Sequence, residues 1–391
     1  MINLKTSISS SRIRLLILSL LMGFWLTGCG KNQEVEGYQW PIIDGFPKPQ
    51  VPADNPMSAE KVSLGRMLFY DKNLSANQTQ SCASCHLQEY AFAEPLATSV
   101  GSTGDIHRRN APALVNIAYN KTLTWAHDGL TSIELQLLLP MFSESPVELG
   151  ITNHEQEVLA RFQTPAYRAL FRQAFPDDFS FIFGSEEVSF DLITKALASF
   201  VRSLISFDSP FDHYAYWRDD SALPEEAIRG MNLFFSERLE CHHCHGGFNF
   251  TQSTGHEKQL IDRRPFHNIG LYNVDGASLY PVEDNGLAEI STLSADNGRF
   301  RAPTLRNVAV TAPYMHDGSI KTLEQVIDFY ADGGRNIIQG PYRGDGRKNI
   351  LKSPFMKGFT LTTRERHDLL AFLHSLTDKA FLTAPEHAAP E

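Results

Sequence analysis

The feature that most constrains this chain is a pentad, Cys-x-x-Cys-His, which occurs twice. The two copies are Cys82-Ala83-Ser84-Cys85-His86 and Cys241-His242-His243-Cys244-His245. In such a pentad the two thiols bond covalently to the vinyl groups of a haem, and the histidine that follows binds its iron. The sequence therefore predicts two c-type haems, with His86 and His245 as iron ligands.

A pair of zinc sites is the alternative interpretation of the two pentads. Zinc would require further clustered cysteine or histidine ligands, so we favour haem. His242 and His243 fill the variable positions of the second pentad. We expect them to be exposed side chains without a role of their own.

The first 29 residues have the features of an export signal. Lys5, Arg12 and Arg14 come before an apolar run over residues 15–26, and the run ends in Leu26-Thr27-Gly28-Cys29. We interpret residues 1–28 as a bacterial lipoprotein signal peptide that is cleaved before Cys29. An uncleaved membrane anchor is the alternative, but the run is shorter than the roughly 20 apolar residues that a span needs.

The signal predicts a mature chain on the periplasmic side of a bacterial membrane, outer or inner, with a lipid anchor on Cys29. This location suits the pentads, because cytochrome c maturation takes place outside the cytoplasm. All 5 cysteines then have a use, so none is left for a disulfide. The formal net charge of −10 argues against a nucleic-acid partner.

Chain length and the separation of the pentads predict two domains with one haem each. The proline-rich residues 29–57 are expected to form a tether from the lipid anchor. A polar stretch at Asp219–Pro224 marks the expected boundary between an N-terminal haem domain (58–218) and a C-terminal haem domain (219–391). We call these two ranges the first half and the second half.

The expected fold class is mainly α, with two c-type cytochrome domains, long loops and few short strands. Ser58 is a good N-cap for a helix that leads to the first pentad, and Pro224 can open a helix that leads to the second. Further helices are predicted near 155–175, 190–205, 323–330 and 363–376. Residues 246–300 are expected to be rich in loops. Beyond the pentad no internal repeat is apparent.

Several segments carry a more specific signal: Leu64–Phe69, Ser81–His86, Arg109–Leu114, Ala302–Asn307 and Thr311–Gly318. In this order they resemble the bacterial di-haem cytochrome c peroxidases and the related MauG-type enzymes, over roughly residues 58–377. The resemblance implies that two c-type cytochrome domains face each other. It also implies a peroxide-reactive haem in the first half, an electron-transfer haem in the second half, and hydrogen peroxide as a substrate.

The resemblance also assigns residues around the first haem. In peroxidases that need reductive activation a histidine fills the sixth iron site, but its position here is Ser102, so we expect an iron that is open to peroxide. His107 is a nearby competitor, for which we favour a solvated or propionate-contacting role. Glu148 matches the family's distal glutamate, which moves a proton between the peroxide oxygens. Glu144 is the alternative carboxylate.

Gln136 and Pro140 match the neighbours of that glutamate in the family. At the second haem the family's sixth ligand is methionine in electron-accepting peroxidases and tyrosine in the MauG group, and its position here is Tyr330. A phenolate favours higher oxidation states of iron than a thioether does. Met315 and Met356 are the alternative ligands.

Two further assignments concern the space between the haems. Trp125 is the candidate for a tryptophan that relays electrons in the family, with plain core packing as the alternative. Asn110, with the carbonyl groups of Thr311 and Pro313, matches an interdomain calcium site. The resemblance therefore implies two covalent haems and one Ca²⁺ as cofactors.

The hypothesis that follows is a peroxide-dependent di-haem oxidoreductase. Ser102 and Tyr330 place the chain nearest the MauG-type and methanobactin-associated di-haem enzymes, which oxidise residues of a protein partner, for example tryptophan. The first alternative is a cytochrome c peroxidase that takes electrons from a small c-type cytochrome or another donor. The second is a di-haem electron carrier without catalysis.

Overall fold

Several helices in this protein begin at a residue whose side chain caps them. The computed structural model describes residues 38–177 and 187–390. Helix α2 (Ala59–Tyr70) starts after Ser58, whose hydroxyl accepts a hydrogen bond from the backbone N–H of Lys61 at 3.2 Å. This confirms the predicted N-cap. The predicted signal peptide and Cys29 lie outside the described residues.

The first half is helical, as expected. After α2 its α-helices are α3 (Ile133–Phe142), α4 (Glu155–Phe162), α5 (Pro165–Ala174), α7 (Phe190–Ser203) and α8 (Pro210–Tyr216). Its short 3₁₀ helices are η1 (Lys72–Leu74), η2 (Cys82–Ser84), η3 (Gln88–Tyr90) and η4 (Ile117–Tyr119). The helical region predicted near 155–175 is divided, because Thr164 caps a new helix with Pro165 in its first turn.

The second half contains fewer residues in helices and the only described strands. Its α-helices are α9 (Glu225–Phe234), α10 (His242–His245), α11 (Ala288–Ser291), α12 (Leu323–Ala331), α13 (Thr363–His374) and α14 (Lys379–Thr383). Its 3₁₀ helices are η5 (Ser294–Asp296), η6 (Val308–Val310) and η7 (Gly346–Lys348). Strands β1 (Asn336–Ile337) and β2 (Gly344–Asp345) pair antiparallel. The prediction of few short strands is therefore confirmed for the described residues.

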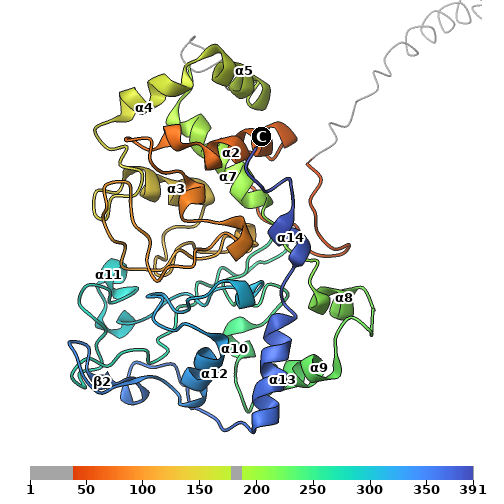
Figure 1. Ribbon diagram of the computed structural model, residues 1–391, viewed down its shortest axis with the longest axis vertical. Coiled ribbons are helices and arrows are strands. Elements are labelled where there is room, and N and C mark those ends of the chain that lie inside the picture. The colour runs from red at the N-terminus through yellow and green to blue at the C-terminus, as the bar shows by residue number, and fades with distance from the viewer. Residues whose placement is uncertain (1–37, 178–186, 391) are drawn as a thin grey trace, which may run out of the picture. The chain divides into compact units, whose positions relative to one another are not determined.

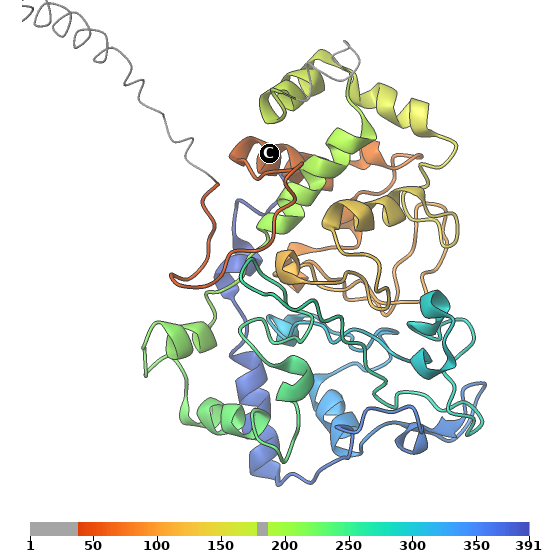
Figure 2. The ribbon, with the colours of Figure 1, turned by 180° about the vertical axis from the view of Figure 1, so that it is seen from behind.

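Each half contains a pair of helices that cross at a glycine. In Figure 1, α2 lies against α7 in the upper part and α9 against α13 in the lower part, and Figure 2 shows the same pairs from behind. A Cβ atom on Gly65 of α2 would overlap the carbonyl oxygen of Ala196 in α7. One on Gly230 of α9 would overlap the carbonyl oxygen of Asp368 in α13. The two helix pairs approach closely because neither glycine has a side chain.

The two halves share more sequence than the pentad alone. Gly-x-x-Leu-Phe occurs at Gly65–Phe69 and Gly230–Phe234, and Ala-Pro-x-Leu-x-Asn occurs at Ala111–Asn116 and Ala302–Asn307. Both asparagines adopt the left-handed conformation, with φ of 53° and 60°. Each donates its backbone N–H to a carbonyl just beyond the second helix of its pair, at Leu204 and Leu376, both at 2.9 Å. The expectation of no further internal repeat was wrong.

The described part of the predicted tether is packed against the first half. Trp40, Ile42, Ile43 and Phe46 contact a buried cluster formed by Tyr119, Ile205 and Phe207. Removing these large apolar side chains from water lowers the free energy of the packed arrangement, whereas a free tether would leave them exposed. Residues 40–57 therefore belong to the folded part of the chain.

The end of the chain returns to the first half. Phe381 of α14 joins the first-half core, and the Tyr70 hydroxyl donates a hydrogen bond to the carbonyl of His387 at 2.8 Å. This contact crosses the expected boundary between the halves. Among the described residues no helix has both the length and the apolar character that crossing a membrane requires.

Candidate functional site

The second pentad opens onto a cavity lined mostly by the second half, with a few residues of the first half. Cys241, Cys244 and His245 form part of its wall. The Nδ1 atom of His245 lies 3.0 Å from the carbonyl oxygen of Pro303 and 3.3 Å from that of Phe250. An imidazole that donates from Nδ1 to a carbonyl leaves Nε2 free to bind a metal. His245 is therefore held as an axial haem ligand must be.

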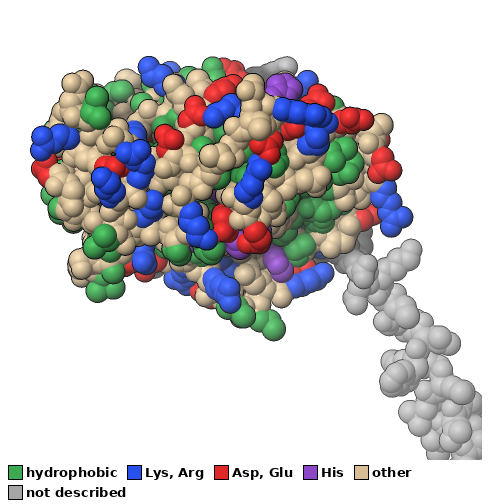
Figure 3. All heavy atoms as spheres, turned by 90° about the horizontal axis from the view of Figure 1, so that it is seen from below, with side chains coloured by type: hydrophobic (Ala, Val, Ile, Leu, Met, Phe, Trp, Pro, Cys, Tyr) green, Lys and Arg blue, Asp and Glu red, His purple; other side chains and the backbone are tan. Residues whose placement is uncertain are grey.

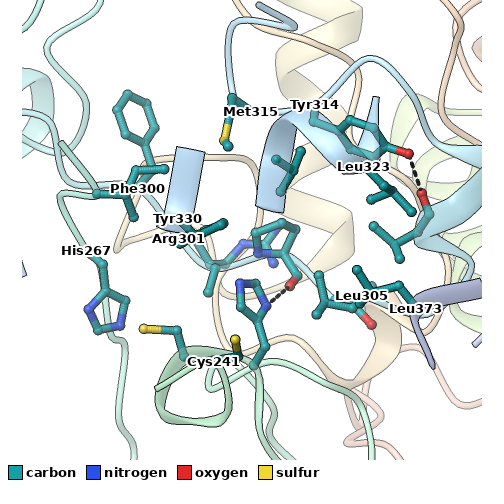
Figure 4. A pocket seen from close by; sticks show the side chains of 18 of the residues that line it. Cys241, His267, Phe300, Arg301, Leu305, Tyr314, Met315, Leu323, Tyr330 and Leu373 are labelled. Carbon is teal, nitrogen blue, oxygen red and sulfur yellow. Dashed lines mark hydrogen bonds between the residues drawn. The ribbon is translucent and has the colours of Figure 1, made fainter. Parts of the chain in front are cut away.

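The three predicted candidates for the opposite axial position all line this cavity. They are Tyr330 on α12, Met315 and Met356, and Figure 4 shows Tyr330 and Met315 among the lining side chains. Burial raises the pKa of the Tyr330 phenol. The phenolate form therefore depends on a positive charge such as a bound ferric ion.

The chemistry of the cavity fits a covalently bound haem. Its wall is mainly apolar and includes Phe300, Leu305, Leu323 and Leu373 (Figure 4). All four pentad cysteines carry free thiols. Burial raises the pKa of Cys241 to about 12, so its thiol stays protonated at neutral pH. An apolar slot with two free thiols and an oriented imidazole is what a c-type haem requires.

The first pentad is arranged similarly on 3₁₀ helix η2. The Nδ1 atom of His86 lies 2.6 Å from the carbonyl oxygen of Phe92, so its Nε2 is also free for a metal. Burial raises the pKa of the Cys82 thiol to about 12, and the negative charge of Glu148 adds to this shift. Glu148 therefore lies near the cysteines of this pentad.

Two other segments hold the backbone of Glu148 in place. Its carbonyl accepts a hydrogen bond from the N–H of Ser102 at 2.8 Å, and the N–H of Leu149 donates to the carbonyl of Pro140 on α3 at 2.9 Å. A Cβ atom on Gly101 would overlap the carbonyl oxygen of Val147. The glycine loop and α3 therefore bring Ser102, Pro140 and Glu148 together, as the resemblance implies.

The Glu148 carboxylate has an unusual electrostatic environment. Its side chain is 39% exposed and lies 3.8 Å from Nδ1 of His107, measured from Oε1. Burial by the protein atoms around it raises the pKa of Glu148 to about 7. A carboxyl group with this pKa is able both to accept and to release a proton near neutral pH. Glu144, the alternative, is exposed.

Of the two roles expected for His107, solvated or propionate-contacting, its burial argues against the solvated one. Its side chain is only 15% exposed, and burial lowers its pKa. Arg108 and Arg109 do not hold it in solvent, because they pair with Glu289 and Asp284 of the second half at 2.8 and 2.7 Å. His107 is therefore largely enclosed and lies beside the more exposed Glu148. Gln136 lies on α3 and is partly exposed.

Trp125 lies where the two halves meet. It is 9% exposed and lines the second-half cavity. Its indole N–H donates to the carbonyl of Asn110 at 2.8 Å, and its own carbonyl accepts from the N–H of Arg301 at 2.7 Å. Sequence reasoning did not single out Arg301, although it directly precedes Ala302-Pro303. Its guanidinium also donates to the carbonyl of Thr124 at 2.9 Å.

The three residues predicted for calcium lie in one wall of the same cavity. Asn110, Thr311 and Pro313 all line it. The Asn110 side chain donates from Nδ2 to the carbonyl of Leu96 at 2.9 Å. This hydrogen bond fixes the orientation of the side-chain amide and leaves its Oδ1 atom available as a ligand. Calcium binding itself stays a prediction.

Comparison with known proteins identifies the family. The family model described as di-haem cytochrome c peroxidase matches residues 59–221. The chain is 33% identical to the cytochrome-c peroxidase IdrP1 of Pseudomonas sp. (strain SCT), over 94% of this chain and 92% of that protein. It is also 33% identical to the methylamine utilization protein MauG of Methylorubrum extorquens, over 86% and 83% of the two chains.

Solved structures agree with this assignment. One is described as a MauG-like protein associated with microbial copper homeostasis. It is 46% identical and superposes with a TM-score of 0.86, over 90% of this chain and 99% of that one. The di-haem peroxidase BthA of Burkholderia thailandensis, in a Y463M variant, shares the fold at 22% identity and a TM-score of 0.63. The chain belongs to the family of di-haem cytochrome c peroxidases and MauG proteins, which are peroxide-dependent oxidoreductases.

Proposed function

We propose that this protein uses hydrogen peroxide to oxidise residues of a protein partner, for example tryptophan, in the manner of MauG-type enzymes. Two covalent haems, when bound at His86 and His245, supply the iron that takes up the two oxidising equivalents of peroxide. The observation that carries the proposal is the pair of Ser102 and Glu148 beside the first pentad. A serine hydroxyl is a poor iron ligand, so peroxide has access without prior reduction.

Glu148 is the residue that moves the proton. With a haem held at His86, the Glu148 carboxylate would accept a proton from one oxygen of hydrogen peroxide and return it to the other, so that the O–O bond breaks and the second oxygen leaves as water. Its pKa of about 7 suits both steps. His107, at 3.8 Å, orients the carboxylate, and Gln136 on α3 completes the polar wall.

The second half stores and delivers the oxidising equivalents. Trp125, held between Asn110 and Arg301, passes electrons between the two haem sites. Tyr330, which lines the cavity of the second pentad, would hold the second haem iron through its phenolate oxygen. Asn110, Thr311 and Pro313 would hold a Ca²⁺ ion, which would fix the two halves relative to each other.

The cellular setting is part of the proposal. Two haem domains, over 58–218 and 219–391, are held on the periplasmic side of a membrane by a lipid on Cys29. The protein partner is therefore also periplasmic. The described similarity to a MauG-like protein associated with microbial copper homeostasis supports a MauG-like reaction here.

The experiment that tests this proposal starts from the holoprotein with both haems ferric. Hydrogen peroxide is mixed in without any reductant, and the absorption and EPR spectra are followed. An immediate spectral change at both haems is expected. If the protein reacts only after one haem is reduced, the proposal is wrong and a reductively activated cytochrome c peroxidase replaces it.

One observation favours the alternative of a cytochrome c peroxidase: Met315 and Met356 line the same cavity as Tyr330, and methionine is the ligand expected in such a peroxidase. Tyr330→Phe separates the two ligand assignments. Axial ligands move haem potentials over a range of about 0.8 V, so loss of a phenolate should raise the potential of one haem by on the order of 100 mV. Met315→Leu and Met356→Leu are the matched variants, and a large shift in either instead would support methionine ligation.

A further inference from the structure

The second pentad carries a group of side chains that haem attachment does not use. Among residues 38–177 and 187–390, Glu237, His242 and His243 are the only group of three acidic, histidine or cysteine side chains whose ligand atoms all lie within 4.8 Å of one another. His242 and His243 stand between the two pentad cysteines. On the face of the molecule seen in Figure 3, histidine and acidic side chains adjoin each other.

The distances within this group match those between ligands of one metal ion. Nε2 of His242 lies 3.4 Å from Oε1 of Glu237, and Nε2 of His243 lies 3.2 Å from Oε2 of the same carboxylate. Two ligand atoms that are each about 2.0–2.1 Å from a tetrahedral ion are about 3.3 Å apart. A small ion therefore fits among the three side chains with little rearrangement.

The two imidazole rings are held in place by packing. Their centroids are 4.2 Å apart, with planes inclined by 33°. The His243 ring also stacks on Phe355, with centroids 4.4 Å apart and planes inclined by 13°. Nδ1 of His242 is buried and has no hydrogen-bond partner. An ordinary ion pair would need only one imidazole for one carboxylate, whereas here both Nε2 atoms face Glu237.

A fourth ligand is within reach. Oε2 of Glu240 lies 2.8 Å from Nε2 of His243. The other Glu240 oxygen pairs with Lys357 at 3.2 Å, and that lysine is largely exposed, so it can move away at small cost. Two imidazoles and two carboxylates would complete a tetrahedral set.

We propose that Glu237, His242 and His243, with Glu240 as the fourth ligand, bind a divalent transition-metal ion. Imidazole nitrogen and carboxylate oxygen suit both Cu²⁺ and Zn²⁺, and for a site of given ligands Cu²⁺ binds more tightly. The ion lies on the outer side of the segment whose cysteines hold the second haem. This inference does not depend on the proposed oxidation of a partner.

The test uses the full holoprotein with both haems attached. Equilibrium dialysis against Cu²⁺, and separately against Zn²⁺, should show one bound ion per chain in addition to the haem iron. The EPR spectrum of bound Cu²⁺ should show hyperfine coupling to imidazole nitrogen. Zn²⁺ should be displaced by an equal concentration of Cu²⁺.

Variants decide whether the binding occurs at this cluster. Loss of a group that only orients a metal ligand weakens binding by about 10- to 100-fold, so Glu237→Gln, His242→Gln and His243→Gln should each weaken Cu²⁺ binding by at least about 10-fold. Glu237 lies outside the pentad, so its variant leaves haem attachment untouched. Mass spectrometry confirms two haems in each variant.

The matched control is His154→Gln. His154 is an exposed histidine that faces Glu157 at 3.5 Å, far from the pentad in sequence. It should bind Cu²⁺ as the unchanged protein does. If Glu237→Gln binds Cu²⁺ as tightly as the unchanged protein, or if His154→Gln weakens binding equally, Cu²⁺ binds only at scattered surface histidines and the proposed site is wrong.

Discussion

The two halves of this protein are built on the same frame but differ in the side chains around it. Each has a pair of helices that meet at a glycine, a pentad, and a left-handed asparagine that ties the helix pair to the loop. Each pentad histidine donates from Nδ1 to a backbone carbonyl. The frame therefore explains how a haem is held, and explains it equally for both halves.

The difference between the halves lies in the other side chains near each pentad. In the first half these are Glu148 and His107, 3.8 Å apart. In the second half they are Tyr330 and two methionines in a mainly apolar cavity lining. Polar groups that exchange protons suit a site that reacts with peroxide, whereas an apolar pocket with a strong ligand suits electron storage. The proposed function therefore assigns the reactivity to a few side chains on a shared frame.

The comparison is tested most severely by Glu148→Gln. An amide keeps the shape of the side chain but cannot take up the proton, and general acid–base groups contribute about 10²- to 10⁴-fold to rate. We expect the rate of the ferric protein with hydrogen peroxide, measured by stopped-flow absorption, to fall within that range. The control is Glu144→Gln, an exposed neighbour, which should react normally. An unchanged rate in Glu148→Gln would favour a non-catalytic electron carrier.

The pH dependence of the same reaction tests whether Glu148 is the group that accepts the peroxide proton. The pKa of Glu148 is raised to about 7, so below this pH the carboxyl group is protonated and cannot accept the peroxide proton. The rate should fall about tenfold per unit below pH 7 and level off above it. Stopped-flow measurements between about pH 5.5 and 8.5 check this. In Glu148→Gln the rate should no longer fall below pH 7. If the fall remains in this variant, another group is responsible for it.

Sequence alone predicted the parts of the protein that local chemistry dictates. The two pentads and the Ser58 cap are local patterns, because the residues that act together stand within a few positions. The family resemblance then named Glu148 and Tyr330, which no local pattern would have marked.

What the sequence did not predict depends on contacts between distant segments. The closeness of His107 to Glu148 depends on the hydrogen bond from Ser102 to the Glu148 carbonyl, which joins two loops. The packing of residues 40–57 and of α14 against the first half also depends on long-range burial. The repeat of Ala-Pro-x-Leu-x-Asn was visible in the sequence, but its meaning depends on the φ angles of Asn116 and Asn307.

The shared frame itself is tested by Gly65→Ala and Gly230→Ala. Each added methyl group would overlap a backbone carbonyl of the partner helix, and such overpacking costs about 1–3 kcal/mol. We expect both variants to unfold at lower denaturant concentration, by similar amounts. Gly129→Ala is the control, since its methyl group would meet only the His127 ring, with the nearest atom at 3.2 Å. Loss of stability in one variant alone would mean that the two helix pairs are not equivalent.

Trp125→Phe is expected to have the smallest effect on stability. This variant tests the link between the two halves. Phenylalanine keeps the ring in the cavity wall but loses the hydrogen bond to Asn110, which costs about 1 kcal/mol. The fold should therefore persist, while electrons pass more slowly between the two haem sites. After mixing with peroxide, the spectral changes of the two haems should separate in time. Trp217→Phe, at a tryptophan that is 51% exposed, should leave them simultaneous, and simultaneous changes in Trp125→Phe as well would reduce Trp125 to a packing residue.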